Sequence, residues 1–194
     1  IEILAKTDEP FNKIALKLFE LPEKSVLRYY LIMKLKDLPK NMKAQKRLLS
    51  SWIVEIFIEQ LNSQDNNFIT SNVNRNKLII SDGSPISNDK QNGNPKKSDK
   101  LQKEFYQFLL ENRNCFDKET IYQIIISHNR NDNLLYFANM INDFQFVLKY
   151  YISLQRWDES LKVLATQQNP DLIYKSATVL LVNYPVKTID TWIR

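Results

Sequence analysis

Apolar residues recur at helical spacing along most of this chain, and polar or proline-containing turns separate the short segments that carry them. The first segment runs from Asp8 to Glu20, with Thr7 or Asp8 as the expected cap and Pro10 in the first turn. Its predicted apolar face consists of Phe11, Ile14, Ala15, Leu18 and Phe19. This spacing predicts an amphipathic helix rather than a strand.

Two longer helices are predicted next. One runs from about Pro22 to Leu38 and stops before Pro39, because a proline disfavours helical backbone in the residue that precedes it. The other runs from about Met42 to Leu61. Its expected buried stripe consists of Leu48, Leu49, Trp52, Ile53, Ile56, Phe57 and Leu61. We expect the first three helices to pack together as one layer.

The composition changes between residues 62 and 97, where Asn, Ser, Asp, Lys and Gln dominate. Both glycines of the chain, Gly83 and Gly93, lie in this stretch together with Pro85 and Pro95. Such a segment cannot bury enough apolar surface to offset the entropy of ordering it. It is therefore predicted to be a disordered linker or a long insertion.

Short helices are predicted again from about Ser98 to the end of the chain. Asp and Asn mark helix starts, because their side chains accept hydrogen bonds from the free backbone amides of a first turn. The expected caps and breaks are Asp117, Asn131 or Asp132, Asn169 before Pro170, and Tyr184 before Pro185. The clearest helix pair spans Asp143 to Leu164, with a turn near Gln155 to Trp157.

About ten helices and no strand are thus expected, which predicts an all-α fold. Two helices joined by a short turn cannot bury their apolar faces alone, so neighbours must stack on both sides of them. We predict an α-solenoid of stacked helix pairs with one long disordered loop. Its expected parts are a helical segment at 1–61, the linker at 62–97 and a second helical segment at 98–194 packed on the first.

Composition narrows the chemistry that this scaffold can carry. With two glycines and one cysteine, the chain supplies no phosphate-cradling loop, internal disulfide or cysteine-rich zinc site. Outside Gly83 and Gly93, no position is expected to need the positive φ that glycine adopts most easily. A nucleophile pair of Cys115 and His128 lacks any accompanying oxyanion-hole signature, and His128 is expected in the last turn of a helix. We predict no enzyme, and we assign no catalytic, cofactor-binding or metal-binding residue.

The net charge of +5 is concentrated in one cluster of six cations with Asp37 as the only acid, since six minus one is five. The cations are Lys34, Lys36, Lys40, Lys43, Lys46 and Arg47. They could meet acidic lipid headgroups, nucleic acid or an acidic partner. The preferred interpretation is structural: Lys34 and Lys36 close one helix, where cations favour the dipole, and the others coat the solvent face of the next.

Two features concern the ends and the environment of the chain. No apolar run approaches the roughly 20 residues that span a bilayer, so a soluble protein in a reducing, cytosolic compartment is predicted. The sequence begins with Ile1 and Glu2 rather than methionine and shows no signal-peptide pattern. We therefore expect it to be a piece of a longer protein.

The order of residues in three regions resembles the deep-orange family of class C vacuolar protein sorting subunits. The first is Leu48-Leu49-x-x-Trp52-Ile53-x-Glu55-Ile56-Phe57, similar to the family's Leu-Leu-x-x-Trp-Leu-x-Glu-Leu-Tyr. The second runs from Leu134 through Asn142-Asp143-Phe144 to Leu164. The third is Asn169-Pro170-Asp171-Leu172-Ile173-Tyr174-Lys175, followed by Pro185-x-x-x-Ile189-Asp190-x-Trp192-Ile193. Single helix motifs of this kind are common in solenoids, whereas the ordered set is specific.

The resemblance implies a subunit common to the HOPS and CORVET complexes, which tether endosomal and vacuolar or lysosomal membranes and support their fusion. Members of this family carry a β-propeller, a clathrin-heavy-chain-like solenoid and a RING zinc domain, and only the solenoid matches this chain. The implied partners are other class C subunits, with peripheral membrane association through the complex, no nucleic acid and no small-molecule substrate. The implied location is cytoplasmic, on endosomal and vacuolar or lysosomal membranes. The polar stretch at 62–97 departs from the family pattern.

Two alternatives remain open at this point. One is a coat or nucleoporin-type solenoid, which would differ in the complex that it joins. The other is a helical-repeat nucleic-acid binder, which aromatic and basic residues together would suit. The aromatic residues that raise this possibility are Phe144, Phe146, Tyr150, Tyr151 and Trp157. They occur at helix-packing intervals, so we expect them in the core.

Overall fold

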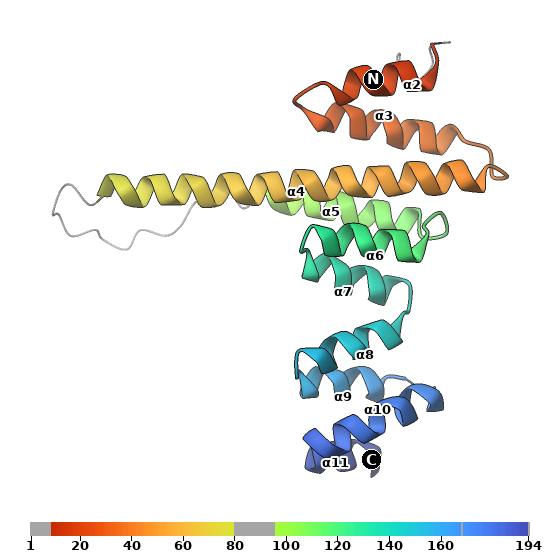
Figure 1. Ribbon diagram of the computed structural model, residues 1–194, viewed down its shortest axis with the longest axis vertical. Helices are drawn as coiled ribbons and strands as arrows, with labels where there is room; N and C mark the ends of the chain where they lie inside the picture. Colours follow the sequence, from red (N-terminus) through yellow and green to blue (C-terminus); the bar gives the residue numbers. More distant parts are fainter. Residues whose placement is uncertain (1–8, 80–95, 168, 194) are drawn as a thin grey trace. The chain divides into compact units, whose positions relative to one another are not determined.

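The computed structural model describes residues 9–79, 96–167 and 169–193, with side chains at 9–66, 99–167 and 169–192. These residues contain ten α-helices and no strand, so the all-α prediction is confirmed (Figure 1). The chain divides into two compact units, Ile1–Asn131 and Asp132–Arg194, which are called unit 1 and unit 2. In the part of the chain that is described, no helix is both long and apolar enough to cross a membrane.

Unit 1 is built around one long helix. Its described helices are α2 (Phe11–Phe19), α3 (Lys24–Asp37), α4 (Lys43–Ile79), α5 (Lys96–Glu111) and α6 (Lys118–Ser127). Helix α3 packs on both α2 and α4, and α4 packs in addition on α5 and α6 (Figure 1). Helix α4 is therefore the central element of the unit.

Because α4 has neighbours on more than one side, it buries residues around much of its circumference. The buried set is Leu49, Ser50, Ile53, Val54, Ile56, Phe57, Ile58 and Leu61. The predicted single stripe missed Val54 and Ile58, because one stripe assumes one buried face. It was wrong about Leu48, which is 74% exposed, and Trp52 is only half-buried. Near the start of α4 only one side is covered, so Leu49 is buried while Leu48 faces solvent.

Helix α4 is also longer than predicted. It continues to Ile79, 18 residues past the expected end at Leu61 (79 minus 61). The intervening residues are rich in Asn and Ser, which are weak helix formers, but they include no glycine or proline that would stop a helix. The predicted linker at 62–97 therefore begins in helix. Its centre, with both glycines, lies outside the described residues, and the division of the chain at 62–97 stays a prediction.

The first described helix, α2, begins two or three residues later than its sequence signals indicated. Pro10 is the N-cap of α2, with extended backbone and no side-chain capping bond, rather than a first-turn residue. Thr7 and Asp8, the predicted caps, lie outside the described residues. Phe11 and Phe19 stay partly exposed, because α3 covers only the face that carries Ile14, Ala15 and Leu18.

Unit 2 consists of five shorter helices in the residues described. They are α7 (Asn131–Met140), α8 (Phe144–Ser153), α9 (Trp157–Ala165), α10 (Pro170–Asn183) and α11 (Pro185–Ile193). Helix α9 packs against α8, α10 and α11. Its Leu161 and Leu164 join Leu148 and Leu180 in the buried core, and Trp157 packs against this cluster.

Polar caps start several of these helices as predicted. The Asp117 carboxylate accepts a hydrogen bond from the Thr120 amide at 3.2 Å, and the Asn169 side chain accepts one from the Asp171 amide at 3.0 Å. The breaks before Pro170 and Pro185 are also confirmed. The predicted cap at Asn131 or Asp132 is wrong, because both residues lie inside the first turn of α7.

Three turns place a residue other than glycine at positive φ, which the sequence did not predict. These residues are Asn129, Asn142 and Gln155, with φ of 56°, 59° and 56°, and they are 13 residues apart (142 minus 129, and 155 minus 142). In each turn the next amide bonds to the carbonyl five residues back, at 3.2, 2.8 and 2.9 Å. This hydrogen bond is the Schellman closure of a helix end. Asn tolerates this conformation, so the turns form without glycine.

Gln155 is the least suited of the three residues to positive φ. Gln155→Gly is expected to stabilise unit 2 by about 1 kcal/mol, because glycine lacks the Cβ that crowds the following carbonyl. Asn142→Gly should raise the stability of unit 2 by less, because Asn already tolerates positive φ. Lys149→Gly, at an exposed position inside α8, is the control and should cost about 0.5–1 kcal/mol. Urea unfolding followed by circular dichroism measures the stability of all three variants, and a loss of stability in Gln155→Gly equal to that in Lys149→Gly contradicts the assigned role of positive φ.

A polar contact joins α9 to the start of α11. The Tyr184 hydroxyl and the Lys187 ammonium both donate to the Oδ1 atom of Asp158, each at 3.0 Å. The hydrogen bonds from Lys187 and Tyr184 lower the pKa of Asp158 below its ordinary value. Both Asp158 and Lys187 are largely exposed, so water screens the pair and its contribution to stability is small.

The lowered pKa of Asp158 predicts the sign of an acid effect. Since the folded pKa lies below the unfolded one, the contact stabilises the fold above about pH 4 and is lost as pH falls through the folded pKa. Asp158→Asn should therefore flatten the loss of stability in acid, measured as unfolding midpoints between about pH 2 and pH 6. Tyr184→Phe removes one of the two hydrogen-bond donors to Asp158, so it should flatten the acid dependence by a smaller amount. An unchanged acid dependence in Asp158→Asn would refute the assignment.

Candidate interaction sites

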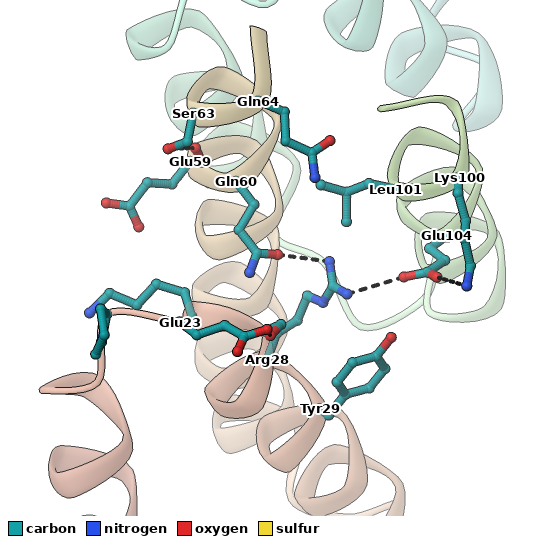
Figure 2. Close-up of a pocket in the computed structure, with 13 residues that line it drawn as sticks. Glu23, Arg28, Tyr29, Glu59, Gln60, Ser63, Gln64, Lys100, Leu101 and Glu104 are labelled. Atoms are coloured by element: carbon teal, nitrogen blue, oxygen red, sulfur yellow. Dashed lines mark hydrogen bonds and ion pairs between the residues drawn. The ribbon is translucent and has the colours of Figure 1, made fainter. Parts of the chain in front are cut away.

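Arg28 is a buried cation at the place where three helices meet. It projects from α3 and is only 3% exposed. Its Nη1 donates to the Oε1 atom of Gln60 in α4 at 2.8 Å, and its Nη2 donates to the Oε2 atom of Glu104 in α5 at 3.1 Å (Figure 2). The guanidinium carbon also lies 4.4 Å from the ring centroid of Phe57. One side chain thus bonds residues 32 and 76 positions away in the sequence.

The energetics of this contact are asymmetric. Moving a charge out of water costs several kcal/mol, and only a well-placed partner recovers that cost. The Glu104 carboxylate supplies the counter-charge, Gln60 an additional acceptor, and the Phe57 ring a cation–π contact. Loss of one partner therefore costs more than the intact contact contributes. Neither α4 nor α5 can separate from α3 without leaving the guanidinium partly unpaired.

An open pocket of about 590 Å³ lies beside the Arg28 contact, between the start of α3 and the facing sides of α4 and α5 (Figure 2). Its charged lining is balanced, with three cations and three carboxylates. These are Lys24, Arg28 and Lys100, and Glu23, Glu59 and Glu104. No histidine or cysteine lines it, and the Ser25 hydroxyl donates a hydrogen bond to the Glu23 carboxylate at 2.6 Å. Two buried atoms, Arg28 Nε and Gln64 Oε1, have no hydrogen-bond partner. The pocket is a packing junction with polar walls, and no catalytic role is assigned to it.

Cys115 and His128 do not form the nucleophile pair considered from the sequence. Cys115 precedes α6, whereas His128 is the C-cap at the other end of that helix. Ten helical residues separate the two ends by about 15 Å. Across the part of the chain that the structure describes, no cluster of three or more His, Cys, Asp and Glu side chains is placed to hold a metal ion.

His128 instead belongs to a polar contact that ties the end of α6 to α4. The Asn62 side chain lies 3.3 Å from His128 Nδ1 and accepts a bond from the Nε of Arg130 at 2.6 Å. Arg130 also donates through Nη2 to the Oδ2 atom of Asp65 at 2.6 Å. These bonds account for the helical start of the predicted linker, because Asn62 and Asp65 are held on α4 by partners more than 60 residues away.

The six cations Lys34, Lys36, Lys40, Lys43, Lys46 and Arg47 gather where α3 ends and α4 begins, and this surface is called the basic corner. Lys34 and Lys36 occupy the last turn of α3, as predicted. Lys43 and Arg47 are exposed on α4, which confirms the expected solvent face for these two residues, whereas Lys46 is half-buried and the exposed Lys40 lies in the connection before α4. The first turn of α4 has no acidic residue, although cations there oppose the helix dipole by about 0.3–1 kcal/mol each. The dipole therefore explains the two lysines of α3 but not the cations of α4.

The Arg28 contact predicts a characteristic pattern of stabilities. Glu104→Leu should destabilise unit 1 by about 3 kcal/mol, because it leaves a buried charge without its counter-charge. Arg28→Met combined with Glu104→Leu should cost less than Glu104→Leu alone, since no buried charge then remains. Lys100→Ala is the control, because exposed Lys100 lies 4.0 Å from the other Glu104 oxygen. Denaturant unfolding of the parent chain, the single variants Glu104→Leu and Arg28→Met, and the double variant measures the cycle, with Lys100→Ala beside it; additive losses of stability would contradict a paired contact.

Comparison with known proteins identifies the family. The family model described as VPS18, alpha-solenoid domain, first half, matches residues 1–143, and the model for the second half matches residues 144–194. The solenoid prediction and the resemblance to class C sorting subunits are thereby confirmed.

Curated relatives agree along nearly the whole chain. "Vacuolar membrane protein pep3" of Schizosaccharomyces pombe is 26% identical over 99% of this chain and 19% of its own length. "Vacuolar protein sorting-associated protein 18 homolog" of Danio rerio is 27% identical over 98% of this chain and 18% of its own length. "Vacuolar sorting protein 18" of Arabidopsis thaliana is 25% identical over 94% of this chain and 17% of its own length. The chain thus spans less than a fifth of these relatives, and it belongs to the VPS18 family through the α-solenoid domain that it matches in both halves.

Proposed function

We propose that this chain is a non-enzymatic scaffold and protein-interaction segment of a membrane-tethering complex. The complex would act in endosome-to-vacuole or endosome-to-lysosome transport and in membrane fusion. The observation that carries the proposal is the match of both halves of the chain to the VPS18 α-solenoid domain. The names of the relatives, which describe vacuolar sorting, support it.

The mechanism follows from how the helices are held. In unit 1, α4 is fixed from two sides and the buried Arg28 resists their separation. In unit 2, leucine packing and Schellman turns close successive short helices. A chain built this way keeps the ends of each unit at a set distance, and its exposed faces remain available to other subunits. No single residue performs this function, which depends on the scaffold as a whole.

The proposed partners are other class C sorting subunits, the shared core of HOPS and CORVET. The proposed location is the cytoplasmic face of endosomal and vacuolar or lysosomal membranes, reached through the complex. Nucleic acid, cofactors and small-molecule substrates have no part in it. The aromatic residues that raised the nucleic-acid alternative were expected in the core, but all five are only half-buried in unit 2. Trp157 packs against the buried leucines, and Tyr150 and Tyr151 lie edge to face at 6.1 Å.

Affinity capture of the full-length parent protein tests this proposal. We expect capture after cross-linking in cells to recover other class C subunits. Glu104→Leu should reduce that recovery, because it loosens unit 1, and the added Arg28→Met should restore it as packing returns. Recovery of coat proteins, nuclear-pore proteins or RNA in place of class C subunits would overturn the proposal. A double variant that is folded but still defective would show that the charges act directly in binding.

A further inference from the structure

We infer that the basic corner docks on the surface of an anionic lipid membrane. This inference goes beyond the proposed function, because it assigns direct lipid contact to this chain rather than to the complex around it. It rests on three observations: four lysines that form no ion pair within the described residues, exposed apolar side chains among them, and the absence of aromatic residues from this part of the sequence.

The first observation is the lack of counter-charge. Lys36, Lys40, Lys43 and Lys46 form no ion pair through their side chains within the described residues. Asp37 is the only acidic residue between Lys34 and Arg47. The neighbouring α5–α6 connection, placed by the bond from Ser50 to the Cys115 carbonyl at 3.3 Å, contributes Asp117, which feels the charge of Arg47. The six cations of the basic corner and the two acidic residues Asp37 and Asp117 together give a net charge of +4.

The second observation is that apolar side chains are exposed among these cations. Met42, in the connection, is 41% exposed, and Leu48, in the second turn of α4, is 74% exposed. Ala44 lies one helical turn before Leu48 and is also exposed. Within the described residues of unit 1, none of these three side chains is buried. At a bilayer surface such residues enter the boundary of the acyl chains, while lysine ammonium groups remain at the phosphates.

The third observation is the residue composition of the corner, which favours an anionic membrane over nucleic acid or an acidic protein as the partner. No aromatic residue lies between Lys34 and Leu49, so the corner has no platform on which bases could stack. Five of its six cations are lysines, which act as flexible point charges and need no bidentate partner. They gather where α3 ends and α4 begins, and none of them lines the pocket beside Arg28. Figure 1 shows the connection between these two helices. A diffuse anionic surface matches this arrangement better than a shaped acidic partner.

Vesicle flotation of the 194-residue chain tests the inference. We expect binding to phosphatidylcholine vesicles that contain about 30% phosphatidylserine, none to pure phosphatidylcholine, and loss of binding at high salt. The corner variant combines Lys36→Glu, Lys40→Glu, Lys43→Glu and Arg47→Glu. It should lower affinity for anionic vesicles at least about tenfold, since each cation near such a surface contributes about fivefold. Met42→Ser with Leu48→Ser should lower affinity severalfold while keeping the salt dependence.

A control variant with the same net charge isolates the position of the charges. It combines exposed lysines from elsewhere in the two units, namely Lys17→Glu, Lys103→Glu, Lys149→Glu and Lys175→Glu. Its affinity should stay within about threefold of the parent, and circular dichroism should show unchanged helix content in all variants. Equal losses in both charge variants, or no flotation of the parent chain, overturn the inference. The inference is also overturned if the corner binds single-stranded RNA or polyglutamate but the chain does not bind vesicles, because the corner then serves another partner. None of these results bears on class C subunit capture.

Discussion

The packing of unit 1 depends on one buried charge. Arg28 cannot leave water without its partners, and these lie on α4 and α5, on either side of the longest polar stretch of the sequence. The contact therefore selects the arrangement in which α3, α4 and α5 meet. Apolar burial supplies most of the free energy, through residues such as Phe57 and Phe105, but many helix registers could bury apolar surface. Few of these helix registers also place Gln60 and Glu104 beside the Arg28 guanidinium, and a shifted register would leave it unpaired.

The short helices of unit 2 solve a different problem, which is how to end a helix repeatedly without glycine. Backbone closures at Asn142 and Gln155, like that at Asn129, use a residue at positive φ and satisfy carbonyls that would otherwise lack partners. The same turns place Asp143 where its carboxylate caps the following helix. Helix end and helix start are thus specified within four or five residues, which suits a stack of short elements.

The sequence predicted what depends on local chemistry. Periodicity predicted the helices, and Asp117 and Asn169 marked their starts correctly, because capping is a contact between near neighbours. It failed where the outcome depends on distant residues. Whether α4 stops at Leu61 depends in part on Arg130, and whether Leu48 is buried depends on which sides other helices cover. Arg28 had one signal, a cation set between the apolar positions Leu27 and Leu31 of a predicted helix, but its partners could not be read from local spacing.

A scaffold requires that its helices move as one body, and this is the central claim for unit 1. Native-state hydrogen exchange measures it most directly, through the opening free energies of amides in α3, the first half of α4, and α5. We expect one shared opening free energy for the three helices, lowered equally in all of them by Glu104→Leu. If α5 opened independently, with α3 unaffected by Glu104→Leu, the buried Arg28 contact would not be what holds unit 1 together.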